Sequence, residues 1–405
     1  MRLMTTLACS LALTVAALAQ DLPERPYPQG NAFPLGAFSL HPVEEIPQAT
    51  AFGWNFGHTY HFDATYLDAA LANGLYSLAT LPRPEGEVTW DTVRERITEC
   101  AARENVVWWN LPEELRYWRA GEWEMVERMP QLTRELDPQQ RPNFMYFPNH
   151  YTAAAMARYV PSLDIIGAGV YVDSVGLPRP WVRWRIEAEI EAIQRAGHEV
   201  GQDYLAGERT PILVPMLYWR EGIDVISPHE AYHDFWSGIC AGARGVLVFS
   251  YWHQRDTAIL KQTWAAYSRA AAEITGEERL GQVVLFGEPF AGVSFAITQG
   301  PAMGAAFFPP GHDYEVRYPS LNVRAWSFEG SLYVLAVSSA ERAVTARLLG
   351  LPQGATEAQA LFETVTPEEG AQPVARTVTI TGGALEDSFA GLGVHIYRIA
   401  WPVEG

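Results

Sequence analysis

Eight short apolar runs alternate with amphipathic helical stretches between residues 33 and 282, and this alternation constrains the fold more than any other feature. Apolar runs without an alternating polar face predict strands buried on both sides, and such strands pair in parallel when a helix connects each one to the next. Eight such units in about 250 residues are typical of a closed (β/α)8 TIM barrel. The strands are expected at 33–40, 49–60, 74–81, 105–111, 142–148, 163–172, 211–219 and 243–252.

Helical patterns occupy the segments between these strands. Val93, Ile97 and Ala101 are spaced as one buried face of a helix over residues 91–105. Ser227-Pro228-His229-Glu230 has the pattern of a capping box with proline at the first helical position. Only the first strand-to-strand connection lacks a clear helix. An open doubly wound sheet is the alternative, but no glycine-rich phosphate turn follows the first strand. Further helices are expected at 63–74, 122–137, 152–159, 182–197, 228–242 and 257–275.

After about residue 282 the chain changes to short alternating segments separated by Gly, Pro, Asn and Asp, without a helix-length amphipathic pattern. This composition predicts an all-β sandwich over 283–405. The predicted fold class is therefore α/β, a TIM barrel over 33–282 followed by an all-β C-terminal sandwich domain. Because the join at 276–282 is short, we expect the sandwich to pack against the barrel.

The first residues combine Arg2, a continuous apolar run and the sequence Ala17-Leu18-Ala19. These features predict a secretory signal peptide over 1–19, followed by an N-terminal lead-in over 20–32. We therefore expect a secreted or periplasmic protein. The apolar run is too short to span a bilayer comfortably, and no later segment is long and apolar enough, so no integral membrane segment is expected.

Three cysteines are present, and Cys9 would be removed with the signal peptide. Cys100 and Cys240 fall in predicted helices that are far apart in the fold. Two buried free thiols are therefore favoured, and a disulfide between them is the alternative. A chain of this size without disulfides depends on a large apolar core for its stability.

The formal net charge of −18 argues against a nucleic acid or an anionic membrane surface as partner. An acidic chain with 14 Trp, 18 Tyr and 17 Phe suits a neutral or weakly charged ligand whose faces stack on aromatic rings. Sugars form such a class, so a carbohydrate substrate is expected, with no cofactor and no metal. The sequence does not specify an oligomeric state.

The stretch VVWWNLPEEL, residues 106–115, ends the fourth predicted strand with Glu113 and Glu114. Active sites of TIM barrels lie on the loops that follow the strands, so both glutamates are expected at the mouth of the barrel. Cleavage of a glycosidic bond needs two carboxyl groups, one protonated and one ionised. Other strand ends supply His41, His58 and His61, Pro82-Arg83-Pro84, Asn149-His150-Tyr151, Tyr171 and Asp173, Trp219 and Glu221, and Tyr251-Trp252-His253.

These residues resemble the superfamily of retaining (β/α)8 glycoside hydrolases, whose acid/base glutamate ends the fourth strand and whose nucleophile glutamate ends the seventh. The resemblance covers the barrel, and a trailing β-sandwich is common in the same group. It implies Glu114 as acid/base, with Glu113 as its neighbour, and Glu221 as nucleophile. From their positions at the strand ends, Glu113 is the substitute for Glu114 and Asp173 the reserve for Glu221. The mechanism requires a raised pKa for Glu114. The sequence departs from the superfamily in one respect. Glu113 occupies the place of the asparagine that normally precedes the acid/base, and Asn110 lies upstream.

Aromatic and polar side chains at the strand ends are the candidate substrate-binding residues. Each also has a structural interpretation, as part of a packing layer or as a hydrogen-bonded histidine. The candidates are Trp109, Asn110, His58, His61, Asn149, His150, Tyr171, Trp219, Tyr251 and Trp252.

Two other functions remain open. His58 and His61, with His150 and Asp256, would suit a metal-dependent hydrolase, although the H-x-x-H spacing differs from a tight H-x-H after the first strand. The unusual PEE sequence would suit a catalytically inactive TIM barrel that binds carbohydrate. No G-x-S-x-G, G-x-G-x-x-G or P-loop motif is present.

Overall fold

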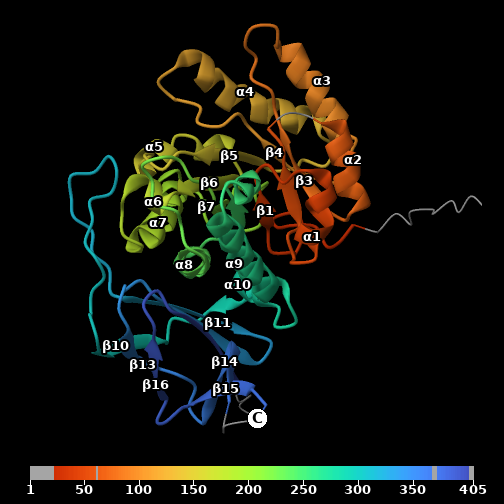
Figure 1. The fold of residues 1–405 in the computed structure, drawn as a ribbon. Coiled ribbons are helices and arrows are strands. Elements are labelled where there is room, and N and C mark those ends of the chain that lie inside the picture. Colours follow the sequence, from red (N-terminus) through yellow and green to blue (C-terminus); the bar gives the residue numbers. More distant parts are fainter. Residues whose placement is uncertain (1–21, 61–62, 367–371, 401–405) are drawn as a thin grey trace, which may run out of the picture.

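The computed structural model describes residues 22–60, 63–366 and 372–400. Eight parallel strands close into a barrel in chain order, and β1 pairs with β8 (Figure 1). The predicted TIM barrel is therefore confirmed. The predicted signal peptide and His61 lie outside the described residues. The strands are β1 (Leu35–Ala37), β2 (Phe56–His58), β3 (Tyr76–Thr80), β4 (Val106–Asn110), β5 (Asn143–Phe147), β6 (Ile165–Val170), β7 (Thr210–Pro215) and β8 (Val246–Val248).

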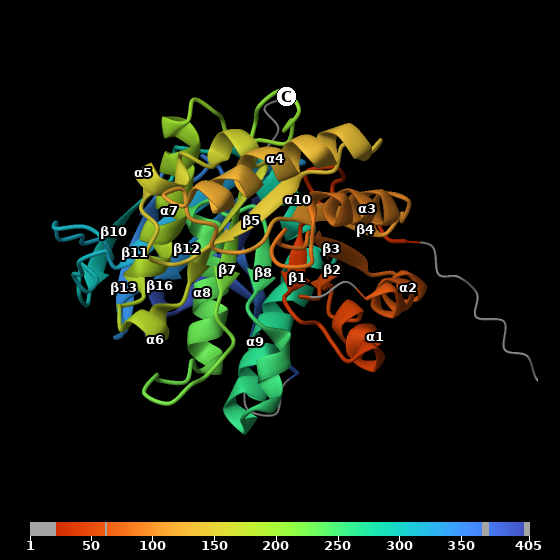
Figure 2. The ribbon, with the colours of Figure 1, turned by 90° about the horizontal axis from the view of Figure 1, so that it is seen from above.

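Helices surround these strands, as the view from above shows (Figure 2). The predicted capping box begins α8: the Ser227 hydroxyl accepts from the Glu230 amide, and the Glu230 carboxylate accepts from the Ser227 amide. The elements of this layer are η1 (Val43–Glu45), α1 (Ile46–Thr50), α2 (Ala64–Ala72), α3 (Trp90–Ala101), α4 (Ala120–Leu136), α5 (Ala153–Met156), η2 (Val160–Ser162), α6 (Val172–Val175), α7 (Pro180–Arg195), α8 (Pro228–Ala241), η3 (Tyr251–Arg255) and α9 (Ala258–Thr275).

Several helices differ from the sequence-based expectation: α6 and η3 begin at Val172 and Tyr251, where strands were expected, and α1 and α10 change the element limits. The short helix α1, with Pro47 in its first turn, fills the first connection and includes residues 49–50, which were expected in the second strand. Gly53, with a φ of +88°, then turns the chain, so β2 begins only at Phe56. Helix α10 (Leu280–Phe286) runs across residue 282, where the sandwich was expected to begin. The domain limit at this residue stays a prediction.

The C-terminal part consists of two antiparallel sheets, which confirms the all-β prediction. One has the order β10-β13-β16 and the other the order β15-β14-β17-β12-β11-β9. Their strands are β9 (Glu288–Pro289), β10 (Ser294–Gln299), β11 (Leu321–Phe328), β12 (Ser331–Ser338), β13 (Val344–Leu349), β14 (Glu357–Val365), β15 (Val374–Thr379), β16 (Ala384–Phe389) and β17 (Val394–Ala400).

Strand β12 is buried on both faces, and the two faces serve different cores. Val334 and Ala336 belong to the core between the two sheets. Tyr333 and Leu335, on the other face, belong to the core of the barrel. The six-stranded sheet therefore packs directly on the barrel, as the short join predicted, and Figure 1 places it beneath α8 and α10.

Cys100 and Cys240 are both free and buried, which confirms the prediction of two unpaired thiols. Cys240 lies where α8 meets the six-stranded sheet, with its Sγ 3.8 Å from the Leu335 carbonyl oxygen. Within the part of the chain that the structure describes, no helix has both the length and the apolar character needed to cross a membrane.

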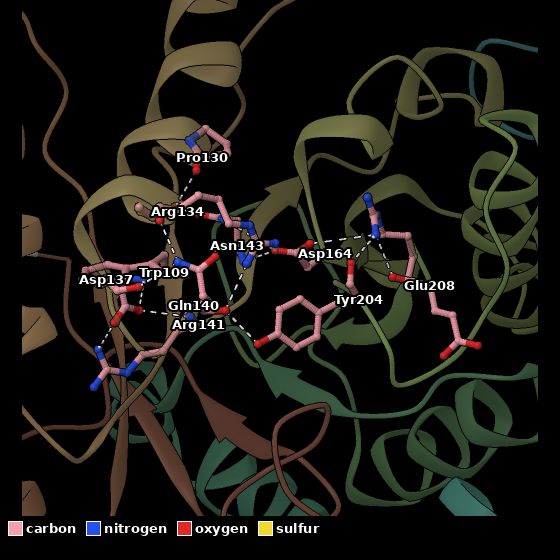
Figure 3. A network of polar contacts seen from close by, with 12 residues as sticks. Trp109, Pro130, Arg134, Asp137, Gln140, Arg141, Asn143, Asp164, Tyr204 and Glu208 are labelled. Carbon is pink, nitrogen blue, oxygen red and sulfur yellow. Dashed lines mark hydrogen bonds and ion pairs between the residues drawn. The ribbon is translucent and has the colours of Figure 1, made fainter. Parts of the chain in front are cut away.

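A polar network fixes the N-terminal ends of β5 and β6 (Figure 3). Asp137, at the end of α4, accepts hydrogen bonds from the Trp109 indole (3.0 Å) and from the fully buried Arg141 guanidinium (3.0 Å). Arg134, on the same helix, donates to Asp164 just before β6 (2.6 Å). Because this network lies at the end of the barrel opposite the strand tips, it contributes to stability rather than to a site.

Candidate active site

A cavity of about 950 Å³ opens where β2, β3, β4 and β5 end. It is lined by Tyr60 after β2, by residues between Thr80 and Val88 after β3, by residues between Asn110 and Trp118 after β4, and by the loop Pro148–Tyr151 after β5. Helix α3 contributes Arg96. The cavity thus occupies the end of the barrel where TIM barrels carry their active sites.

The Glu113 carboxyl group lies in this cavity wall, and its Oε1 is buried without a hydrogen-bond partner. Burial and the neighbouring charge of Glu114 raise its pKa to about 7, against the opposing effects of the Arg83 guanidinium and a hydrogen bond from Tyr60. A carboxyl group with this pKa is about half protonated at neutral pH. It can therefore donate a proton to a leaving group.

Glu114 lines the same cavity, but its side chain is exposed. Its φ of +58° lies in the left-handed region, which residues other than glycine rarely adopt. Its amide donates to the Tyr146 carbonyl of β5 (3.4 Å). This turn gives the two adjacent carboxyl groups different environments. The buried position expected for an acid/base belongs to Glu113 rather than to the exposed Glu114.

Asn110, at the end of β4, lines the cavity beside the two glutamates. Its Nδ2 lies 3.1 Å from His58 Nε2 and 3.3 Å from Thr80 Oγ1, while its Oδ1 is buried without a partner. His58 is fully buried, and burial lowers its pKa to about 3, so the imidazole is neutral. His58 and Thr80 therefore fix the Asn110 amide, which is the group placed to meet a ligand.

Some side chains of the loop after β5 line the cavity, and others do not. His150 is exposed and lines the cavity, whereas Asn149 is half-buried and does not line it. Tyr151 also lines the cavity, and its hydroxyl donates to the Leu115 carbonyl (3.2 Å). This hydrogen bond joins the loop to the segment that carries Glu113.

Three of the predicted substrate-binding aromatics are buried in the barrel. Trp109 belongs to the network at the opposite end, through its bond to Asp137. Tyr171 packs parallel to Tyr146, with 6.0 Å between the ring centroids. Tyr251 donates its hydroxyl hydrogen to Glu45. None of the three lines the cavity, and their contacts are those of packing residues.

The acids and aromatics at the later strand ends lie apart from the cavity. Glu221 is exposed and does not line it. Trp219 and Trp252 are also exposed outside the lining, and Trp252 packs on His41 with 4.8 Å between the ring centroids. The arrangement therefore does not bring Glu221 together with Glu113 and Glu114.

Asp173, on α6, takes part in an ion-pair cluster. Arg179 donates to it at 2.7 Å and also pairs with Glu230 (2.8 Å) and Asp234 (2.7 Å). Burial raises the pKa of Asp173 to about 6, against the opposing charge of Arg179. These contacts connect α6, α7 and α8, and they give Asp173 a structural partner in place of a ligand.

Several cavity residues had no predicted role in the site, although Arg83 was expected at a strand end. Trp118 is 58% exposed and stacks on Tyr151, with 6.3 Å between the ring centroids. Tyr60 and Arg83 flank Glu113. The sequence contained one sign of Trp118: it is a large aromatic residue in the polar stretch RYWRAGE, four residues after Glu114. An exposed tryptophan beside a pair of carboxyl groups is a suitable surface for a sugar ring.

Among residues 22–60, 63–366 and 372–400, no group of three or more His, Cys, Asp and Glu side chains is arranged to hold a metal ion. His61, the second histidine of the metal-dependent alternative, lies outside these ranges.

No protein-family model matches the chain, and no curated protein matches its sequence. Solved structures do resemble its fold. The GH51 arabinofuranosidase from Xanthomonas axonopodis pv. citri has a TM-score of 0.54 and 10% identity, over 91% of this chain and 96% of that one. The α-amylase from Geobacillus thermoleovorans has a TM-score of 0.53 and 8% identity, over 89% and 92%. An Anoxybacillus α-amylase has a TM-score of 0.51 and 9% identity, over 90% of each chain. The similarity covers both the barrel and the sandwich, and at this level of identity it shows a shared fold alone.

Proposed function

We propose that the protein is an exported glycoside hydrolase that cleaves glycosidic bonds in an oligo- or polysaccharide, with Glu113 as its general acid. The observation that carries the proposal is the buried Glu113 carboxyl group, with a pKa of about 7, in the wall of a cavity at the mouth of a TIM barrel. The exposed Trp118 and the fixed Asn110 amide supply an aromatic surface and a polar contact for a sugar. The names of the similar structures, an arabinofuranosidase and two α-amylases, agree with this function.

In the proposed reaction Glu113 protonates the glycosidic oxygen as the bond to the anomeric carbon breaks. The retaining mechanism implied by the superfamily resemblance then requires an ionised carboxylate that attacks this carbon. Glu114 is the other acid among the described lining residues, so we assign it this role in place of Glu221. Glu113 afterwards removes a proton from the water that hydrolyses the glycosyl-enzyme.

The test compares Glu113→Gln, Glu114→Gln and, as matched control, the exposed Glu221→Gln. On oligosaccharides we expect kcat to fall about 10²–10⁴-fold in Glu113→Gln. On a dinitrophenyl glycoside, whose leaving group needs no protonation, the loss in this variant should be much smaller. Glu221→Gln should retain the wild-type rates. Wild-type kcat in Glu113→Gln on oligosaccharides would overturn the assignment.

Proton NMR of the first anomer formed tests retention. N-terminal sequencing of exported protein tests the predicted start at Gln20.

One observation favours a second candidate, a TIM barrel that binds carbohydrate without cleaving it. The two acids of the described cavity lining are adjacent in the chain and separated by the turn at Glu114, whereas hydrolases place their carboxyl groups on either side of the bond. This candidate predicts glycan binding by the wild type without product, and equal binding by Glu113→Gln. Release of sugar that depends on Glu113 would exclude it.

A further inference from the structure

The cavity is lined by three arginines, although the chain as a whole has a net charge of −18. The chain has a single lysine, Lys261, so its basic side chains are almost all guanidinium groups. Guanidinium presents a planar fork of donors that matches a carboxylate or sulfate group. The three arginines, Arg83, Arg96 and Arg116, differ in how closely a carboxylate of the protein approaches them.

Arg116 has one. Its Nε lies 2.9 and 3.1 Å from the two oxygens of Glu122, so its charge is compensated within the protein. Arg96, on α3, lies 3.7 Å from Glu99. The charges of Arg116 and Arg96 thus both have a carboxylate neighbour within the protein.

Arg83 is in direct contact with the segment that carries Glu113. Its Nη2 donates to the backbone carbonyl oxygen of Glu113 (2.7 Å), which fixes the guanidinium group beside the proposed acid. Its nearest carboxylate is that of Glu85, at 3.8 Å from Nη1, too long for a hydrogen bond. Glu85 is also 63% exposed, so water weakens this pair. Among the described residues, Arg83 is thus a cavity cation without a hydrogen-bonded carboxylate.

The backbone around Arg83 is preorganised. Pro82 and Pro84 flank it, which fixes φ on both sides and keeps Arg83 itself extended. The Leu81 amide donates to the Asn110 carbonyl (2.9 Å), so the segment continues the pairing of β3 with β4. A charged group held in this way loses little conformational freedom when it binds a ligand.

The charges of the cavity lining permit an anionic ligand beside Arg83, although Glu114 contributes a carboxylate to the same lining. With its pKa of about 7, Glu113 is about half protonated at neutral pH and so repels an anion less than a fully ionised carboxylate would. A cationic group in a concave site of an acidic protein focuses the field on that site. These features differ from the neutral or weakly charged ligand that the composition suggested.

We propose that the cavity accepts a saccharide with an acidic substituent, a carboxylate or a sulfate, on the ring next to the cleaved bond, and that Arg83 binds this substituent. The inference rests on the proposed saccharide site, and it adds the charge of the substrate. A charge-assisted fork between guanidinium and the acidic group would orient the ring so that its glycosidic oxygen meets Glu113.

Binding is tested in the Glu113→Gln background, where the proposed cleavage does not interfere. The probes are matched trisaccharides of galacturonic acid and galactose, and of glucuronic acid and glucose, titrated by calorimetry. A second set with sulfated galactose distinguishes sulfate from carboxylate as the recognised group. We expect at least one acidic trisaccharide to bind tenfold or more tightly than its neutral partner, and the preference to weaken as NaCl is raised from 0.05 to 0.5 M.

Adding Arg83→Gln should abolish this preference, and Arg83→Lys, which keeps the charge without the fork, should retain part of it. Arg195→Gln, at an exposed arginine of α7, is the matched control and should leave the preference unchanged.

Equal binding of acidic and neutral probes, or a preference that survives in Arg83→Gln, overturns the inference. Hydrolysis of neutral trisaccharides at the same rate as acidic ones would overturn it too and leave the hydrolase intact. Acid-selective binding by a wild type that releases no product would instead overturn the proposed hydrolysis and leave this inference standing.

Discussion

Glu113 combines a chemical role with a cost to stability. Because its pKa is raised from 4.5 to about 7, the folded protein binds more protons than the unfolded chain between these values. The free energy of unfolding therefore falls as pH rises from about 4.5 to 7 and stays lowered above it. Glutamine does not ionise, so its contribution to stability does not change with pH. We compare the free energy of unfolding of Glu113→Gln with that of the wild type at each pH. This difference should favour the variant by about 1–3 kcal/mol more at pH 8 than at pH 4.

Urea unfolding at the two pH values measures this difference, with the exposed Glu221→Gln as control. Equal effects of Glu113→Gln at pH 4 and pH 8 would show that the folded protein does not hold this carboxyl group protonated.

The same group sets the pH dependence of activity. Since the proposed acid must be protonated, kcat/KM should decline above about pH 7, approaching a tenfold loss per pH unit. In Glu113→Gln this alkaline limb should disappear from the residual activity. A pH–rate profile on an oligosaccharide substrate provides the measurement, and an alkaline limb that persists in the variant would assign the titrating group elsewhere.

Trp108 and Trp109 show what a single sequence leaves undetermined at the residue scale. Adjacent residues of a strand point to opposite faces, and the sequence gives no sign of which indole meets a ligand. The structure turns Trp109 to the network of Asp137. We expect Trp109→Phe to lower the free energy of unfolding by about 1–3 kcal/mol, because a buried carboxylate loses a donor, and to leave KM unchanged. A raised KM at unchanged stability would return Trp109 to the substrate site.

At the scale of elements, the barrel strands could be predicted because a strand buried on both faces has a continuous apolar run. The helices were placed within a few residues, since their caps and spacing are local features. The limits of β2 were wrong because its aromatic run contains Gly53, where the chain turns. The orientation of the PEE segment could not be predicted, because it depends on a left-handed φ at Glu114, a residue without a local preference for it.

Helix α7 contributes one buried side chain, Arg185, that contacts the loop lining the cavity. Arg185 donates to the carbonyl oxygens of Tyr151 and Pro148, the latter at 2.9 Å, and so holds both ends of the loop after β5. Lysine cannot form this fork. We expect Arg185→Lys to raise KM about tenfold through misplacement of His150 and Tyr151, with a smaller change in kcat. Steady-state kinetics on an oligosaccharide measure the split, and circular dichroism confirms folding. A fall in stability without a change in KM would limit Arg185 to a structural role.

At the scale of the whole molecule, two of the contacts between the described parts of barrel and sandwich involve whole segments. The six-stranded sheet covers α8 and α10, as described above. In addition, an arm over residues 300–320 leaves the sandwich after β10 and extends along α7 to the loop after β5, as the cyan segment of Figure 1 shows. The Tyr318 hydroxyl donates to Glu187 (2.6 Å), and the ring of His312 lies 5.4 Å from that of Trp184. The chain pattern predicted the sandwich, but an irregular arm has no periodicity from which to predict it.

The tip of this arm touches the loop that lines the cavity. Gly311, with a φ of +78°, is so close that a Cβ there would lie 3.3 Å from Thr152 Cγ2 and 3.8 Å from the His150 carbonyl oxygen. The loop is thus held by Arg185 on its inner side and by the arm on its outer side. Because Tyr151 bonds to Leu115, a displacement of the loop would reach the segment of Glu113. The sandwich therefore contributes to the geometry of the cavity from a distance.

Replacing the tip, Phe308 to Glu315, with Asn-Gly should test this contribution. The hydrogen-bonded pair Phe307 and Val316 then directly flanks the two new residues, and Asn-Gly suits such a two-residue turn. We expect KM for an oligosaccharide to rise about fivefold to tenfold, because His150 and Tyr151 lose their outer support. An aryl monosaccharide glycoside, which occupies less of the cavity, should show a smaller change. Tyr318→Phe, which loosens the arm without shortening it, should give an intermediate effect. If both variants unfold as the wild type does and their kinetics are unchanged, the arm only joins the two domains, and the loop is fixed by Arg185 alone.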